Sequence, residues 1–198
     1  ETNIFTLKLN HVWNDDASTT IETYYRSYEA TYIRHDLGTE DDLRETKKGI
    51  ALRQTFVFPE NNTLRIGGDA STWRNPTGKL YYIGLSRQEE AYSLYAQDEW
   101  CVIPEKLSID VGLRWDRTYL DEGVIANGPG FVAGKPVTVQ DQWQDPGISW
   151  SAGLAYHVTK KQTATVRYAM SKQSAGGDIV GAAGASVEDP RETRVELG

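Results

Sequence analysis

Residues 107–115 alternate strictly between large apolar side chains and polar or very small ones. The odd positions carry Leu107, Ile109, Val111, Leu113 and Trp115, and the even positions carry Ser108, Asp110, Gly112 and Arg114. Only an extended strand turns a period of two into two chemically opposite faces. The pattern therefore predicts a β-strand with one apolar face and one polar face.

The preceding segment has a similar alternation and predicts the partner strand of an antiparallel hairpin. One side holds Leu94, Ala96 and Trp100, and the other holds Ser93, Tyr95, Gln97 and Glu99. Asp98 interrupts the apolar side near one end, and Pro104-Glu105-Lys106 predicts a tight reversal between the strands. A strand pair in a soluble sandwich would alternate in the same way, so the pattern alone does not identify what surrounds the apolar face.

The residues of this hairpin resemble a known family. The string YSLYAQDEW, a short turn and LSIDVGLRWDRTY resemble the mid-barrel hairpin of TonB-dependent outer-membrane receptors, whose members typically contain S-x-Y-x-Q-D-x-W, a turn and a strand ending G-x-R-[YW]-[DE]. The segments PGISWSAGLAYHVTKKQTATVRYAMSKQ and ETRVELG resemble further family segments in the expected order. The resemblance implies an all-β fold, an antiparallel up-and-down transmembrane β-barrel.

The rest of the chain predicts about nine strands in total. Besides the hairpin, strands are expected at 5–13, 19–33, 47–58, 63–73, 148–158, 164–170 and from 192 onward, while the segments 34–46, 74–89, 120–147 and 172–190 are expected to be irregular. Short and long connections alternate, as in bacterial outer-membrane barrels. Barrels of the family have 22 strands. Residues 1–198 are therefore expected to form a partial barrel domain that lacks the plug domain, the energy-coupling box and the barrel ends.

Bulk properties restrict the possible functions. The net charge of −7 disfavours a nucleic-acid partner, and no run of 18 apolar residues predicts a membrane-spanning helix. A mean hydropathy of −0.54 is typical of soluble proteins, but a barrel has a polar interior and hydrophilic loops and gives similar values. The single cysteine, Cys101, excludes an internal disulfide.

No catalytic, cofactor or metal site is predicted, so the chain is not expected to be an enzyme. His11, His35 and His157 lie far apart, and no G-x-S-x-G, Walker or H-E-x-x-H motif occurs. A metal site formed by His35 with Asp36, Asp41 or Asp42 is conceivable, but a solvated acidic loop is favoured.

Two sets of residues are candidates for function. The charges predicted to face the barrel lumen are Arg53, Arg65, Asp69, Asp110, Arg114 and Arg167. They either line the passage and hold the plug, or are merely solvated or paired across strands. The aromatic residues predicted to contact a ligand from extracellular loops are Trp73, Tyr81, Tyr82, Phe131 and Trp143. For each of these, a place in an aromatic girdle or in loop packing is the alternative.

The resemblance implies a receptor of the bacterial outer membrane, in contact with its lipid. External loops would bind a scarce solute, and the TonB energy-coupling complex would act through the plug to admit it. The solute could be a ferric siderophore, a cobalamin, an oligosaccharide or a peptide. Two alternatives remain at this point: a soluble or surface-exposed β-rich binding or structural module, and an ungated porin.

Overall fold

The chain is all-β and antiparallel, as predicted. The computed structural model describes residues 1–34, 39–59, 61–76, 86–126, 136–159, 162–172 and 191–197. Its strands are β1 (Thr2–Asn14), β2 (Ala17–Arg34), β3 (Thr39–Phe58), β4 (Asn62–Asn75), β5 (Arg87–Ile103), β6 (Leu107–Ala126), β7 (Pro136–Trp143), β8 (Gly147–Thr159), β9 (Gln162–Lys172) and β10 (Arg191–Leu197). They form one sheet in the order β1-β2-β3-β4-β5-β6-β8-β9-β10, and β7 also pairs with β6.

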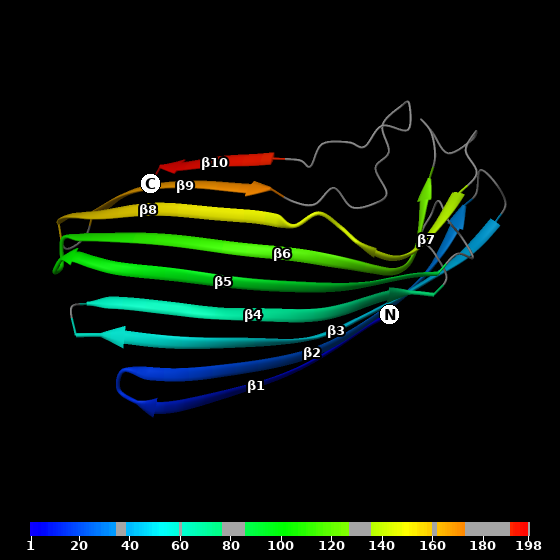
Figure 1. Cartoon of the computed structure of the whole chain (residues 1–198), viewed down its shortest axis with the longest axis horizontal. Helices are drawn as coiled ribbons and strands as arrows, with labels where there is room; N and C mark the ends of the chain where they lie inside the picture. The colour runs from blue at the N-terminus through cyan, green and yellow to red at the C-terminus, as the bar shows by residue number, and fades with distance from the viewer. Residues whose placement is uncertain are drawn as a thin grey trace.

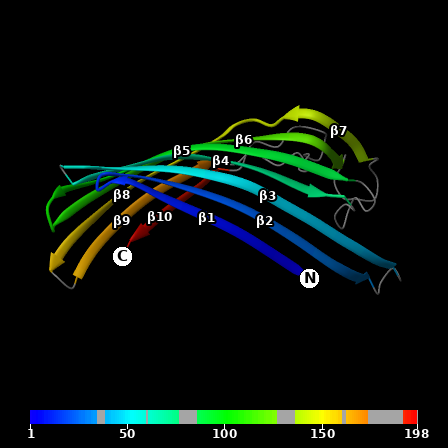
Figure 2. The same ribbon diagram turned by 90° about the horizontal axis from the view of Figure 1, so that it is seen from below.

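The sheet is an up-and-down meander whose two ends differ. Short connections of two or three residues join β1 to β2, β3 to β4, β5 to β6 and β8 to β9, and the strand ends that they join lie together at the left of Figure 1. Longer connections, such as 76–86 and 173–190, join strands at the opposite end. Figure 2 shows that the sheet bends into an arch, and β1 and β10 are its two edges. No helix in the described part of the chain is long and apolar enough to cross a membrane.

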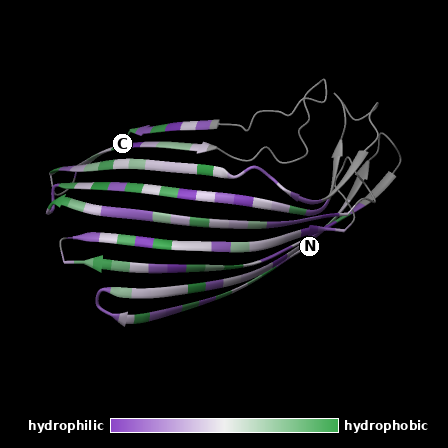
Figure 3. Cartoon of the chain, viewed as in Figure 1, coloured by the Kyte–Doolittle hydropathy of each residue, from purple (hydrophilic) through white to green (hydrophobic). Residues whose placement is uncertain are grey.

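One face of the sheet is apolar across many strands. In register, Leu9 lies opposite Ile21, and the row continues through Leu52, Gly68, Leu94, Trp115 and Ile148. Figure 3 shows hydrophobic and hydrophilic residues interspersed along the coloured parts of the strands. We call this side the apolar face and the opposite side the polar face. Because the ladders pair apolar positions of one strand with apolar positions of the next, the apolar side chains of all these strands form a continuous surface.

Within the described residues, no second layer covers the apolar face. Leu94 and Leu113 are 63% and 57% exposed, and Leu120 is the single buried hydrophobic side chain among the described residues. A soluble sandwich buries such a face between its two sheets. An exposed apolar surface spanning this many strands instead suits a lipid environment.

The strands are longer than the sequence predicted. The segments 34–46, 74–89 and 120–147 were expected to be irregular, but β3 begins at Thr39, β4 ends at Asn75, β5 begins at Arg87 and β6 ends at Ala126. The expectation was wrong at the ends of β3, β4 and β5 because mostly polar residues occupy both faces there. In β6, Asp121, Glu122 and Gly123 interrupt the apolar pattern before Val124 and Ile125. The backbone ladder continues, but the alternation that signals a strand disappears.

Among the strands that the structure describes, β7 is the one that the sequence analysis missed. It pairs with Tyr119–Ala126 of β6, and β8 pairs with Leu107–Asp116 of the same strand. β7 and β8 therefore run in the same direction, one after the other, along the same edge of β6. Between them the Gln144 N–H donates to the Thr118 carbonyl at 2.9 Å. Pro136 opens β7, and Asp141 has φ 55°. These features are typical of turns, and they conceal a strand interrupted by a bulge.

If the apolar face lies in lipid, a charge placed on it will destabilise the protein. Leu52→Arg on β3 is expected to lower the free energy of unfolding by about 2–3 kcal/mol in lipid vesicles. Ala51→Arg is the matched control, because Ala51 lies on the polar face between Glu22 and Asp69 in register. Equal destabilisation by both substitutions, measured on the full-length protein, would contradict the assignment of the faces.

Candidate functional site

All six charges predicted to face a lumen lie on the polar face. Arg53 and Arg114 belong to one register row that runs through Gly67 and Tyr95. The remaining four are Arg65 and Asp69 on β4, Asp110 on β6 and Arg167 on β9. Five of the six take part in ion pairs that connect neighbouring or next-neighbouring strands.

One ion pair crosses over a whole strand. Arg167 Nη2 on β9 lies 2.6 Å from Asp110 Oδ2 on β6, and β8 runs between them. Gly153 of β8 is the register partner of both residues, and a Cβ atom there would collide with the Asp110 carboxylate. The contact therefore depends on a glycine beneath the two charged side chains.

A second ion pair crosses β5, and here too a small residue on the intervening strand leaves room for it. Arg114 Nη2 on β6 lies 3.2 Å from Asp69 Oδ1 on β4, and Arg114 Nε lies 2.7 Å from Asp116 Oδ1. Ser93 of β5 is the register partner of Asp69 and Asp116, and its hydroxyl donates to Asp69 Oδ1 at 2.5 Å. A small hydroxyl residue thus leaves room for the bridge and also takes part in it.

The third pair joins adjacent strands. Arg65 Nη1 on β4 lies 3.1 Å from Glu99 Oε2 on β5. All these side chains are partly exposed, so each pair contributes roughly 0.2–1 kcal/mol to stability. Together they connect strands from β4 to β9.

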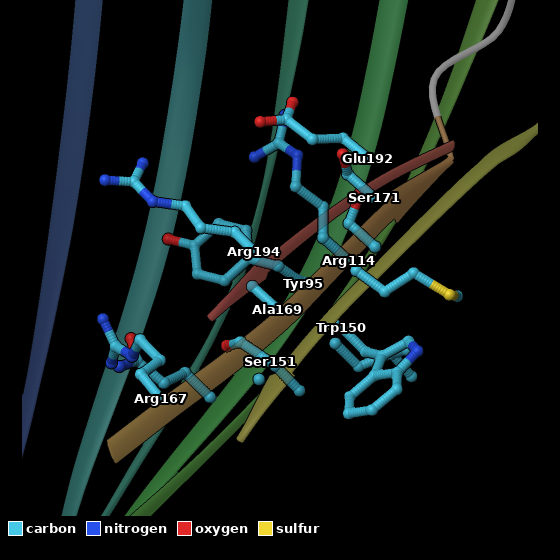
Figure 4. A pocket seen from close by; sticks show the side chains of 15 residues that line it. Tyr95, Arg114, Trp150, Ser151, Arg167, Ala169, Ser171, Glu192 and Arg194 are labelled. Carbon is cyan, nitrogen blue, oxygen red and sulfur yellow. The ribbon is translucent and has the colours of Figure 1, made fainter. Parts of the chain in front are cut away.

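Between these pairs the polar face holds a depression of about 560 Å³. Its floor consists of small residues on three neighbouring strands: Gly112, Ser149, Ser151, Ala169 and Ser171. Around this floor stand Tyr95, Arg114, Arg167 and Arg194, together with Glu192 (Figure 4). We call it the arginine-rimmed depression. Guanidinium and phenol groups around it can donate hydrogen bonds to an acceptor-rich ligand or to a protein segment.

Sequence reasoning identified Arg114 and Arg167 as candidate site residues, but it did not identify the other residues around this depression. Tyr95, Glu192 and Arg194 each fall on the polar side of their strand in the sequence pattern. The pattern of one strand does not show that these three residues share a site. The available signal is a row of small residues, because Gly112, Ser151 and Ala169 are register partners. Finding that row requires the register of β6, β8 and β9.

Of the five aromatic residues predicted to contact a ligand, the structure describes Trp73 and Trp143, which lie on opposite faces of the sheet. Tyr81, Tyr82 and Phe131 lie outside the described residues. Trp73 is in β4, paired with Lys47 and Glu89 on the polar face. Trp143 was expected in a loop, but it lies in β7, where it is the register partner of Tyr119 on the apolar face.

Trp143 belongs to an aromatic cluster at the edge of the apolar band. Its ring centroid lies 5.0 Å from that of Tyr119 and 5.9 Å from that of Tyr92, and the Arg117 guanidinium stands 4.6 Å above it. The Tyr119 hydroxyl donates a hydrogen bond to Asp141 Oδ1 at 2.6 Å. Such amphipathic clusters are typical of a membrane–water boundary.

The described residues contain no group of three or more His, Cys, Asp or Glu side chains that could hold a metal ion. His35 and Asp36, named in the conceivable metal site, lie outside the described residues.

The contact between Asp110 and Arg167 can be tested with a double-mutant cycle. Gly153→Ala is expected to lower the free energy of unfolding by about 1 kcal/mol, because the added methyl group displaces the carboxylate. In an Asp110→Ala background the same substitution should cost close to nothing. A similar cost in both backgrounds would show that Gly153 does not act through Asp110.

Known proteins resemble this chain in both sequence and structure. The family model "TonB dependent receptor-like, beta-barrel" matches residues 1–187. The catecholate siderophore receptor Fiu of Escherichia coli O6:H1 is 25% identical and that of strain K12 is 24% identical, each over 82% of this chain and 23% of the relative. The chain thus spans about a quarter of the length of these curated relatives.

The solved structures support the same fold. The closed form of the ferric-catecholate import receptor Fiu from E. coli K12 has a TM-score of 0.64 at 18% identity, over 100% of this chain and 37% of that chain. Its open form has a TM-score of 0.59 at 18% identity, over 87% of this chain and 35% of that chain. With the match over residues 1–187, these findings show that the chain belongs to the TonB-dependent receptor-like β-barrel family.

Proposed function

We propose that this chain is part of the barrel of an outer-membrane transporter that imports a ferric catecholate siderophore in a TonB-dependent manner. The observation that carries the proposal is the two-sided sheet, with an exposed apolar face and an ion-paired polar face. The relatives named as catecholate siderophore receptors support this substrate over cobalamin, an oligosaccharide or a peptide.

The polar face would line the lumen of the complete barrel. Arg53, Arg65, Asp69, Asp110, Arg114 and Arg167 would then face the passage and the plug. The pairs Arg114–Asp69 and Arg167–Asp110 are partly exposed and cost little to separate, so the plug could replace one partner when it moves. The arginine-rimmed depression would receive either an acidic part of the plug or the passing anionic solute.

The two faces of the sheet also suggest which other molecules the barrel would contact. The apolar face would contact outer-membrane lipid, and the TonB complex would act through a plug. Trp73, on the polar face near the longer connections, is retained as a candidate contact for the solute, as are Tyr81, Tyr82 and Phe131. For Trp143, its position beside Tyr119 and Arg117 on the apolar face supports an anchoring role at the membrane boundary instead.

The two alternatives have less support. A soluble β-rich module would need cover for the apolar face, and Leu52, Leu94 and Leu113 are all more than half exposed. An ungated porin would share the barrel, but family membership favours a gated receptor.

Uptake of iron tests the proposal directly. The full-length receptor, expressed in a strain without other catecholate receptors, is expected to import radioactive iron supplied as its catecholate complex, and only when TonB is present. Uptake that continues without TonB would indicate a porin. Absence of uptake while cobalamin or an oligosaccharide is imported would exclude the proposed substrate.

The polar face can be tested in the same assay. Arg114→Ala combined with Arg167→Ala is expected to lower the uptake rate roughly three- to tenfold at unchanged receptor abundance, which corresponds to the loss of about 1 kcal/mol of interaction. Arg44→Ala is the matched control, because Arg44 is an exposed arginine of β3 that does not line the depression. If Arg44→Ala lowers the uptake rate as much as the double substitution does, the polar face has no specific role in transport.

A further inference from the structure

A pocket that contains two polar side chains interrupts the apolar face at the end with the short connections. It is lined by Phe58, Pro59, Asn62, Leu64 and Asp98 and has a volume of about 440 Å³. Asp98 alternates with Ala96 and Trp100 on β5, so its carboxylate is on the side that is otherwise apolar. A charge on the lipid-facing side of a strand is costly unless it lies near the interface or has a partner.

Two oxygen atoms of this pocket are buried without a hydrogen-bond donor. Asn62 Nδ2 donates to Asp98 Oδ2 at 3.2 Å. The other oxygens, Asn62 Oδ1 and Asp98 Oδ1, are both buried and have no hydrogen-bond partner in the part of the chain that the structure describes. Buried acceptors are almost always paired, and each unpaired one costs free energy. The pocket therefore calls for a ligand that donates hydrogen bonds to both oxygens.

The backbone holds these two side chains in place. Asn61 adopts a left-handed conformation with φ 57°, and its carbonyl accepts a hydrogen bond from Cys101 N–H at 3.0 Å. This bond ties the β3–β4 turn to β5. In register, Asn62 lies opposite Trp100, and Leu64 lies opposite Asp98. The acceptors thus belong to a site formed by three strands and a turn, rather than to a loosely placed surface carboxylate.

The chemistry of the pocket selects a primary ammonium group. It contains the Asp98 carboxylate, which has one free oxygen, and the free amide oxygen of Asn62. Its walls are the apolar side chains of Phe58, Pro59 and Leu64. A primary ammonium carries a positive charge and three donors, enough for both oxygens. A quaternary ammonium such as choline has the charge but no N–H donor. Trp100, 48% exposed next to the pocket, is a residue type typical of the headgroup region.

We propose that the Asp98–Asn62 pocket binds the ammonium headgroup of an ethanolamine phospholipid, in the membrane leaflet at the short-connection end of the barrel. The ammonium donates to Asp98 Oδ1 and Asn62 Oδ1, and the lipid chains continue along the apolar face. This inference rests on the apolar face being in lipid, as in the proposed function, but it does not depend on the solute that is transported.

Lipid selectivity of the full-length receptor tests the proposal. The receptor is reconstituted in an equimolar mixture of ethanolamine and choline phospholipids with identical acyl chains, and retained lipids are counted by native mass spectrometry. Wild-type protein is expected to retain the ethanolamine lipid with about tenfold preference. Asp98→Asn should reduce the preference to near unity, and Asn62→Ala should reduce it partly. Glu105→Gln, which removes an exposed negative charge from the β5–β6 turn, should leave it unchanged.

The outcomes separate the possible explanations. Equal retention of both lipids by the wild-type protein would overturn the proposal without any variant, whether or not Asp98→Asn folds. An undiminished preference in Asp98→Asn would also overturn it. If soluble ethanolamine raises the melting temperature in pure choline lipid as much as the ethanolamine lipid does, the pocket binds a free amine and the lipid assignment fails. Iron uptake is measured separately, so failure here leaves the proposed transport function intact.

Discussion

The backbone ladder between neighbouring strands is the constraint on which the rest of this structure depends. Each strand alternates apolar and polar side chains, but only a shared register turns those alternations into two continuous faces. The row from Leu9 through Leu52 to Trp115 exists because each ladder from β1 to β6 pairs residues of the apolar face with one another along its central part. The register shifts of the β1–β2 and β5–β6 ladders lie near the strand ends. A one-residue slip in any ladder would put charges such as Asp69 or Arg114 on the apolar side.

The polar face has a second level of organisation built on small residues. Side chains of next-neighbouring strands meet only where the strand between them leaves room, and Gly153 and Ser93 provide that room. The same principle forms the arginine-rimmed depression, whose floor is Gly112, Ser151 and Ala169. Long charged side chains and small residues therefore act together, and the resulting pairs are individually weak. This combination suits a surface that must hold a partner and later release it.

Sequence reasoning could predict a strand and its two faces where large apolar side chains alternate with polar ones over most of the strand. Leu107 to Trp115 specify β6 without any structural information, and the predicted side of Asp110 and Arg114 agrees with their place on the polar face. It failed in Thr39–Thr46, where polar residues occupy both faces and alternation carries little signal. It also failed in β7, where Pro136 and the left-handed Asp141 resemble a turn and conceal the alternation of Val137 and Val139 with Thr138 and Gln140. It also could not find the partners of each charge, since Arg167 and Asp110 are far apart in sequence and meet only through the register of β8.

Spin-label accessibility along residues 107–116 of the full-length receptor in lipid is the most direct test of the central claim. Labels at the odd positions are expected to collide most often with oxygen dissolved in lipid, whereas labels at the even positions should respond to a water-soluble relaxation agent or be sheltered from both agents. A period of two in the oxygen signal would place the apolar face in hydrocarbon. Odd positions that are inaccessible to both agents, as in a protein core, would contradict the account.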